Sequence, residues 1–201
     1  MLKNILSGIS AGIMISIGGA VFLACDNRYM GAVLFTVALL SICYRGYVLY
    51  TGKVGFIVNK HGKAELSELF LGLLGNAVGT IACGYAIRYA IPATGEAART
   101  LCDAKLLQAV PSTFIRAVFC GVLMYIAVSI YREKNSIVGI LFGIPVFIIA
   151  GFEHSIADIF YFASSGIVSV RACGFIWIVI LGNSVGAMIL PLLNYERGGE
   201  K

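Results

Sequence analysis

The stretch GNAVGTIACG at residues 75–84 recurs near the end of the chain as GNSVGAMILP at residues 182–191. Each copy lies in the last span of a half that contains three apolar spans. Three is an odd number, so two copies of such a half must enter a membrane in opposite directions. The glycine spacing alone would indicate only close helix packing. Its recurrence at matching places predicts an inverted repeat, with halves at approximately 1–92 and 105–195.

The composition is that of a membrane protein. Of the 201 residues, 59% are hydrophobic and 12% are charged, and the mean hydropathy is +0.92. A soluble domain carries about 25% charged residues, and about 20 apolar residues suffice to cross a bilayer. We therefore expect an all-α polytopic protein that forms a single transmembrane domain, residues 1–201, in the lipid bilayer. The six predicted spans are residues 5–24, 31–58, 66–91, 112–131, 137–163 and 171–194.

The distribution of charge predicts an orientation. The net charge of +5 is spread over loops and helix ends and forms no basic tail, which excludes nucleic-acid binding. Six spans place both termini on one side, where the loops and ends hold seven basic residues against four at most on the other side. This excess predicts a multi-pass protein of the cytoplasmic (inner) membrane with both termini in the cytoplasm. The seven are Lys3, Lys60, Lys63, Arg132, Lys134, Arg197 and Lys201.

The six cysteines do not predict a metal site. They lie singly in apolar surroundings, with no CxxC pair and no histidine at ligand spacing, and are read as small buried hydrophobic residues. No cofactor is expected. The N-terminal stretch ends in FLAC, like a lipoprotein signal peptide, but the internal symmetry requires this segment as a helix.

The second and fifth spans are both interrupted. CYRGYVLYTGKVGFIVNK (43–60) is broken at the Thr-Gly-Lys that begins with Thr51, and ILFGIPVFIIAGFEHSIADIFYF (140–162) is broken over residues 151–155. Paired broken helices predict a substrate site near the bilayer midplane, because unwound backbone is tolerated there only if it is buried or lines a cavity. His154, an ionisable side chain within a span, is a candidate functional residue.

These motifs resemble those of the formate/nitrite transporter family. GFEHSIAD at 151–158 is close to the family's GFEHSIAN signature, LYTGK at 49–53 is similar to its break in the second span, and both GNxVG copies match. The similarity covers essentially the whole chain, which is shorter than typical members. The resemblance implies an aquaporin-like fold and a homopentamer with one pore per protomer. It implies a channel or transporter for small monovalent weak-acid anions such as formate, nitrite, hydrosulfide or a short carboxylate, and no enzyme activity.

The resemblance also implies which residues line the pore. His154 falls on the family's central pore histidine, and Thr51 on the threonine whose hydroxyl faces it. Glu153 is expected to have a structural role, paired with backbone N–H groups or a fourth-span residue. Asp158 stands where the family often has asparagine, and no role is assigned to it. The apolar constrictions and their neighbours are Leu39, Leu49, Phe35, Tyr50 and Phe147.

Two positions depart from the family pattern. Tyr125 stands where the family usually has an asparagine on the fourth span, and Ala109 stands where it has a vestibule lysine. Lys105, one helical turn earlier if that segment is helical, and Arg116 are the candidates for the cation that attracts an anion. Which of them serves stays open, and the choice of substrate with it.

The expected chemistry is proton-linked passage. A bare anion is strongly disfavoured in an apolar constriction, whereas a weak acid in a low-dielectric vestibule takes up a proton and proceeds as the neutral acid. A histidine, with an unperturbed pKa of about 6.5, could hydrogen-bond the passing species or relay its proton. Water is the alternative source of that proton.

Three other functions compete with proton-linked passage. A pore for neutral small solutes is the main alternative, although the paired Asn-Pro-Ala repeats of the water and glycerol channels are absent. An intramembrane hydrolase using His154 and Ser155 is disfavoured, because adjacent residues on a helix do not share a face. A purely structural membrane subunit would show no flux, and two polar breaks at symmetric positions argue against it.

Overall fold

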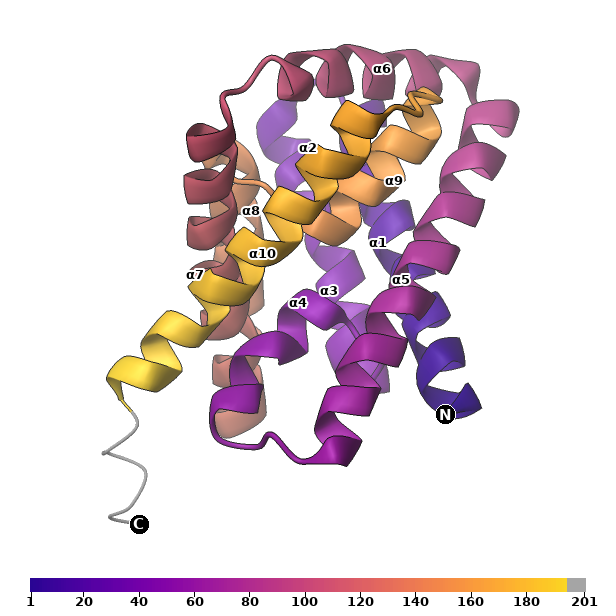
Figure 1. Cartoon of the computed structure of the whole chain (residues 1–201). Coiled ribbons are helices and arrows are strands. Elements are labelled where there is room, and N and C mark those ends of the chain that lie inside the picture. The colour runs from indigo at the N-terminus through magenta and orange to yellow at the C-terminus, as the bar shows by residue number, and fades with distance from the viewer. Residues whose placement is uncertain (195–201) are drawn as a thin grey trace.

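The computed structural model describes residues 1–194, and every regular element in that range is a helix (Figure 1). Arg197 and Lys201, two of the seven basic residues counted above, lie outside the described residues. Five segments are long and apolar enough to cross a membrane, and a bent helix pair makes a sixth. The spans are α1 (Leu2–Ala24), α2 and α3 (Arg28–Leu34 and Thr36–Arg45), α5 (Lys63–Ala90), α7 (Val110–Lys134), the bent pair α8 and α9 (Val138–Ala150 and Ser155–Ser165), and α10 (Val170–Leu193). The predicted all-α fold of six spans is confirmed.

The connection between the halves is itself a helix. No helix was predicted between the spans 66–91 and 112–131, but α6 (Pro92–Leu106) occupies this stretch and lies across one end of the bundle in Figure 1. Proline at the first helical position and several alanines favour this helix. The start of α1 and the end of α10 both lie at the opposite end of the bundle, as six spans require.

Each half is built around a pair of helices that cross at glycines. α1 packs against α5 in the first half, and α7 packs against α10 in the second. A Cβ atom on Gly12 would lie 2.6 Å from the carbonyl oxygen of Asn76, and one on Gly121 would collide with that of Asn183. Only glycine allows these backbones to approach so closely. The matching crossings confirm the inverted repeat; its boundaries at 1–92 and 105–195 stay a prediction.

The helices α3 and α8 end in the same way. Each runs into a glycine in the left-handed conformation, Gly46 (φ 68°) and Gly151 (φ 73°), where a side chain would be strained. In both cases the next residue donates its N–H to a carbonyl of the last helical turn, at 3.0 Å and 2.9 Å respectively. This is the Schellman motif. Two unrelated-looking stretches, YRGYV and IAGFE, therefore form equivalent breaks.

The second span breaks earlier than predicted. α3 ends at Arg45, residues 46–49 leave the helix, and α4 (Tyr50–Lys53) and the short 3-10 helix η1 (Val54–Val58) follow. Thr51 thus lies in the first turn after the break and not at it. The break in the fifth span lies where it was predicted, and the two helices around it are bent by 54°.

A buried asparagine holds the first break in place. The Oδ1 atom of Asn76 accepts a hydrogen bond from the N–H of Tyr50 (2.9 Å). Its Nδ2 donates to the carbonyl oxygens of Gly8 (2.9 Å) and Val48 (2.8 Å). One side chain therefore satisfies backbone groups on both sides of the unwound segment and ties them to α1.

A second asparagine repeats this arrangement in the other half. Asn183 accepts a hydrogen bond from the N–H of Ser155 (2.9 Å) and donates to the carbonyl oxygens of Ala117 (2.9 Å) and Glu153 (2.8 Å). Both asparagines are fully buried. The sequence analysis missed their role, although the signal was present in the second letter of the repeated GNxVG pattern.

Replacing Asn183 with alanine should destabilise the protein strongly. The substitution leaves buried backbone groups of the break without partners, at a cost of about 1–3 kcal/mol for each stranded group. Thermal unfolding of the purified protein in detergent measures the loss, and Asn76→Ala should behave alike. Asn194→Ala, which removes an exposed hydrogen bond to a helix carbonyl, is the control. Equal unfolding temperatures for Asn183→Ala and the control would contradict this account.

The close crossing of α7 and α10 makes a second prediction. A Cβ atom on Gly186 would collide with the carbonyl oxygen of Val118, whereas one on Gly174, in the same helix, meets nothing within 4 Å. Gly186→Ala should therefore lower the unfolding temperature. Gly174→Ala should leave it unchanged or raise it, since alanine favours a helix over glycine by up to about 1 kcal/mol. The same measurement in detergent applies, and a tolerated Gly186→Ala would show that the crossing can relax.

Candidate transport pathway

Two cavities enter the protein from opposite ends. The cavity at the end where the described chain starts and stops, here the termini-side cavity, has a volume of about 400 Å³ and is lined by parts of α3, α4, η1, α5 and α7. The cavity next to α6, here the α6-side cavity, has a volume of about 190 Å³ and is lined by α6, the α8–α9 break and α9. Each break thus borders one of the cavities.

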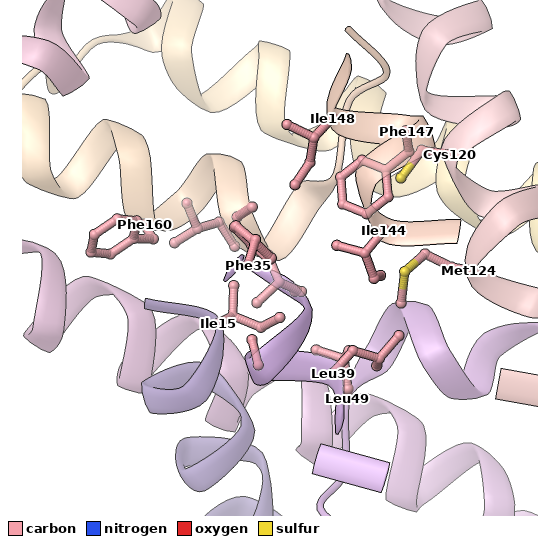
Figure 2. Close-up of a cluster of buried hydrophobic side chains, with 14 of the residues drawn as sticks. Ile15, Phe35, Leu39, Leu49, Cys120, Met124, Ile144, Phe147, Ile148 and Phe160 are labelled. Carbon is pink, nitrogen blue, oxygen red and sulfur yellow. The ribbon is translucent and has the colours of Figure 1, made fainter. Parts of the chain in front are cut away.

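A buried apolar layer lies between the cavities. Leu39 and Leu49 line the termini-side cavity, and Phe147 lines the α6-side cavity. Phe35 meets Phe147 edge to face, with 6.4 Å between the ring centroids. All four belong to one buried cluster, which Figure 2 draws with Ile144 and Met124. Four residues expected at the constrictions therefore lie together.

A hydrogen bond between side chains joins the two breaks. The Oγ1 atom of Thr51 lies 2.9 Å from Nε2 of His154, and both residues are buried. The Nδ1 atom of His154 accepts a hydrogen bond from the N–H of Ala157 (3.1 Å), so in the neutral ring Nε2 carries the hydrogen and donates it to Thr51. The ring of Phe147 stacks on the imidazole with 5.6 Å between centroids. Within residues 1–194 the hydroxyl hydrogen of Thr51 has no other acceptor, so it can serve a passing one.

His154 also caps a helix. It is the N-cap residue of α9, and its Nδ1 satisfies one of the backbone N–H groups that a helix start leaves open. Leu49 occupies the equivalent N-cap position of α4 in the other half. The same place in the two repeats therefore holds a polar side chain in one half and an apolar side chain in the other.

The capping role can be separated from the imidazole itself. Asparagine at position 154 can still accept the N–H of Ala157, whereas phenylalanine cannot, and losing an N-cap costs about 0.5–2 kcal/mol. We expect His154→Asn to unfold at a clearly higher temperature than His154→Phe. Ser169→Ala, which removes the side-chain cap of α10, gives the effect of cap loss alone. If the two variants at position 154 were equally stable, the cap would contribute nothing.

Lys105 lies in a buried ionic cluster beside the α6-side cavity. Its Nζ forms an ion pair with the carboxylate of Glu153 and lies 3.0 Å from Oδ1 of Asp158. The Nε2 of Gln108 donates to the other Glu153 oxygen (2.8 Å). The side-chain partners of Glu153 thus come from α6 and the turn after it, where backbone N–H groups or a fourth-span residue had been expected. Asp158, to which no role was assigned, is a full member of the cluster.

The remaining candidates lie around the pathway. Arg116 lines the α6-side cavity, where its Nη1 donates to the carbonyl oxygen of Gly151 (2.9 Å). The hydroxyl of Tyr50 lies 2.8 Å from that of Ser184. Tyr125 packs its ring against Phe56, and in the described part of the chain it lines neither cavity.

The termini-side cavity has a charged rim. Lys53 and Glu68 form a half-exposed ion pair (2.7 Å), and the guanidinium of Arg132 lies 4.1 Å from the ring centroid of Phe56. Lys60 and Glu65 complete the charged lining. Lys53 therefore has an acidic partner at the rim of this cavity.

Comparison with known proteins agrees with this architecture. A family model described as formate/nitrite transporter matches residues 1–196. The chain belongs to the formate/nitrite transporter family. This confirms the resemblance read from GFEHSIAD and its companion motifs. It also confirms that the chain is not an enzyme, because the family consists of transporters and channels.

Individual relatives are distant. The uncharacterized transporter YwcJ of Bacillus subtilis (strain 168) is 27% identical over 185 residues, which is 82% of this chain and 72% of that protein. The formate-nitrite transporter of Plasmodium ovale is 26% identical over 193 residues, and the match spans 80% of this chain but only 62% of the relative.

Solved structures share the fold. A pentameric formate channel with formate bound superposes with a TM-score of 0.85 at 21% identity, and the match covers 100% of this chain and 98% of that one. An ion channel of the same family gives a TM-score of 0.77 at 19% identity, with coverage of 98% and 88%. The aquaporin-like arrangement expected from the resemblance is therefore present.

Proposed function

We propose that this protein is a membrane channel or transporter for small monovalent weak-acid anions, which cross as the protonated acid or together with a proton. Formate, nitrite, hydrosulfide and short carboxylates are the substrate class. The observation that carries the proposal is the hydrogen bond of Thr51 to His154 where the two breaks meet, inside the apolar layer between the cavities.

The apolar layer favours a neutral species. An anion that entered between Leu39, Leu49 and the two phenylalanines would lose its hydration shell without gaining a compensating charge, which is prohibitive in so dry a site. The protonated acid carries no charge and needs only a hydrogen-bond partner. Cavities that reach this layer from both ends keep the dry part of the path short.

Thr51 and His154 supply that partner. The imidazole holds the threonine hydroxyl by donating from Nε2, so the hydroxyl can turn its own hydrogen toward a passing carboxylic oxygen. A small acid can therefore exchange its water contacts for one contact in the middle of the layer.

We further propose that five copies assemble in the cytoplasmic membrane with both termini in the cytoplasm. The similar structure described as a pentameric formate channel supports the number. The basic residues Lys3, Lys60, Lys63, Arg132 and Lys134 at the termini-side end support the orientation. Large side chains such as Phe70, Phe142 and Trp177 are exposed on the outside of one copy, as contact with lipid or neighbouring copies requires.

Flux into liposomes tests the function. The purified protein is reconstituted with an internal pH dye, and inward gradients of formate, nitrite, hydrosulfide, lactate and acetate are imposed. We expect rapid acidification with one or two of these acids, because entry of the neutral acid releases a proton inside. Thr51→Val should slow it at least tenfold, whereas Thr51→Ser, which keeps the hydroxyl, should retain most of it.

Neutral solutes provide the control. Swelling of the same liposomes with urea or glycerol, with no response to any acid, would replace the proposal by a pore for neutral solutes. His154→Phe with wild-type flux at every pH would remove the histidine from the pathway. Each variant is compared at equal reconstituted amounts after its unfolding temperature has been measured.

A further inference from the structure

The cluster around Lys105 holds more negative than positive groups. One ammonium group faces two carboxylates, those of Glu153 and Asp158. Glu153 is 2% exposed and Asp158 is 1% exposed, so both carboxylates are almost fully desolvated and meet water only where they line the α6-side cavity. With both carboxylates ionised the cluster would bear a net charge of −1 beside the pathway.

The surrounding groups do not neutralise this surplus charge. Within residues 1–194, neither Arg116 nor Arg28 forms an ion pair; they donate instead to the backbone carbonyls of Gly151 and Ile148. Both ring nitrogens of His154 already form hydrogen bonds, since Nδ1 caps α9 and Nε2 donates to Thr51. The other titratable side chains near the cluster are uncharged thiols and a phenol, namely Cys102 of α6, Cys120 of α7 and Tyr161 of α9.

One oxygen of the cluster lacks a partner. Oδ1 of Asp158 faces Lys105, but Oδ2 is buried and forms no hydrogen bond with any described residue. An ionised oxygen in that position is unfavourable, and two carboxylates that share one cation in a dry site cannot both remain charged. A proton on this pair of carboxyl groups removes the surplus charge.

We propose that Glu153 and Asp158 together hold one proton beside Lys105 and give it to the anion that enters the α6-side cavity. This inference rests on the proposed function. An O–H bond of the carboxyl pair breaks, and the proton binds a lone pair of the anion, which becomes the neutral acid. The carboxylate that remains takes up a proton from water in the cavity. The acid then proceeds to Thr51.

The proton also decides whether an anion enters. When the carboxyl pair has lost its proton, the cluster is negative and repels an anion; when the proton is present, the cluster is neutral and Lys105 can attract one. Entry from the α6 side should therefore fall as the pH on that side rises, beyond the fall caused by the smaller amount of free acid.

The pH dependence of formate uptake tests this. Initial rates of acidification are measured at external pH values from about 5 to 8 and are compared with the concentration of formic acid. In the wild type we expect the acidification rate to fall more steeply with rising pH than the formic acid concentration does. This additional decrease should approach about tenfold for each pH unit. Asp158→Asn should be slower at low pH and should lose the additional decrease. Asp103→Asn, the same change at an exposed position of α6, should match the wild type. An unchanged profile in Asp158→Asn overturns the proposal.

Infrared spectroscopy tests the proton site without transport. The purified protein in detergent should show the carbonyl stretch of a protonated carboxylic acid, and this band should disappear in Asp158→Asn and in Glu153→Gln but persist in Asp103→Asn. Absence of the band in the wild type overturns the shared proton. If the band is present but formate does not acidify the liposomes, the proton site stands and the proposed function fails.

Discussion

The structure depends on satisfying unwound backbone in an apolar interior. Residues 46–49 and 151–154 leave the helix near the middle of the bundle, where water cannot serve their N–H and carbonyl groups. Asn76 and Asn183 bind those groups with both ends of their side chains and anchor them to α1 and α7. Without these amides, buried N–H and carbonyl groups of both breaks would have no hydrogen-bond partner.

The pathway follows from this arrangement. Because each break is fixed, Thr51 and His154 meet from opposite halves at hydrogen-bond distance, and the side chains of the apolar layer pack around them. The glycine crossings bring α1 against α5 and α7 against α10 closely enough for the asparagines to reach across. Each of the two cavities then borders one of the breaks. The close helix packing, the hydrogen bonds of the break and the side chain at the pathway thus depend on one another, and this arrangement occurs once in each half.

The repeat, the number of spans and the break at GFEHS could be predicted from the sequence, because each corresponds to a local pattern of residues. The sequence misplaced the break in the second span, since Thr51-Gly52-Lys53 looks more disruptive than Gly46, and only the left-handed conformation of Gly46 distinguishes them. It could not give the partners of Glu153. Those depend on α6, a helix outside the predicted spans, which brings Lys105 to Glu153. Contacts between segments that lie far apart in the sequence cannot be predicted from the spacing of residues within a motif.

The equivalence of Leu49 and His154 has an evolutionary consequence. A duplicated fold begins with the same side chain at both helix caps, and its two asparagines bind the backbone of both breaks without involving the cap side chains. Each cap is then free to change without loss of the scaffold. A passage with different chemistry in its two halves can arise from an initially symmetric ancestor through substitution at a single pair of related positions.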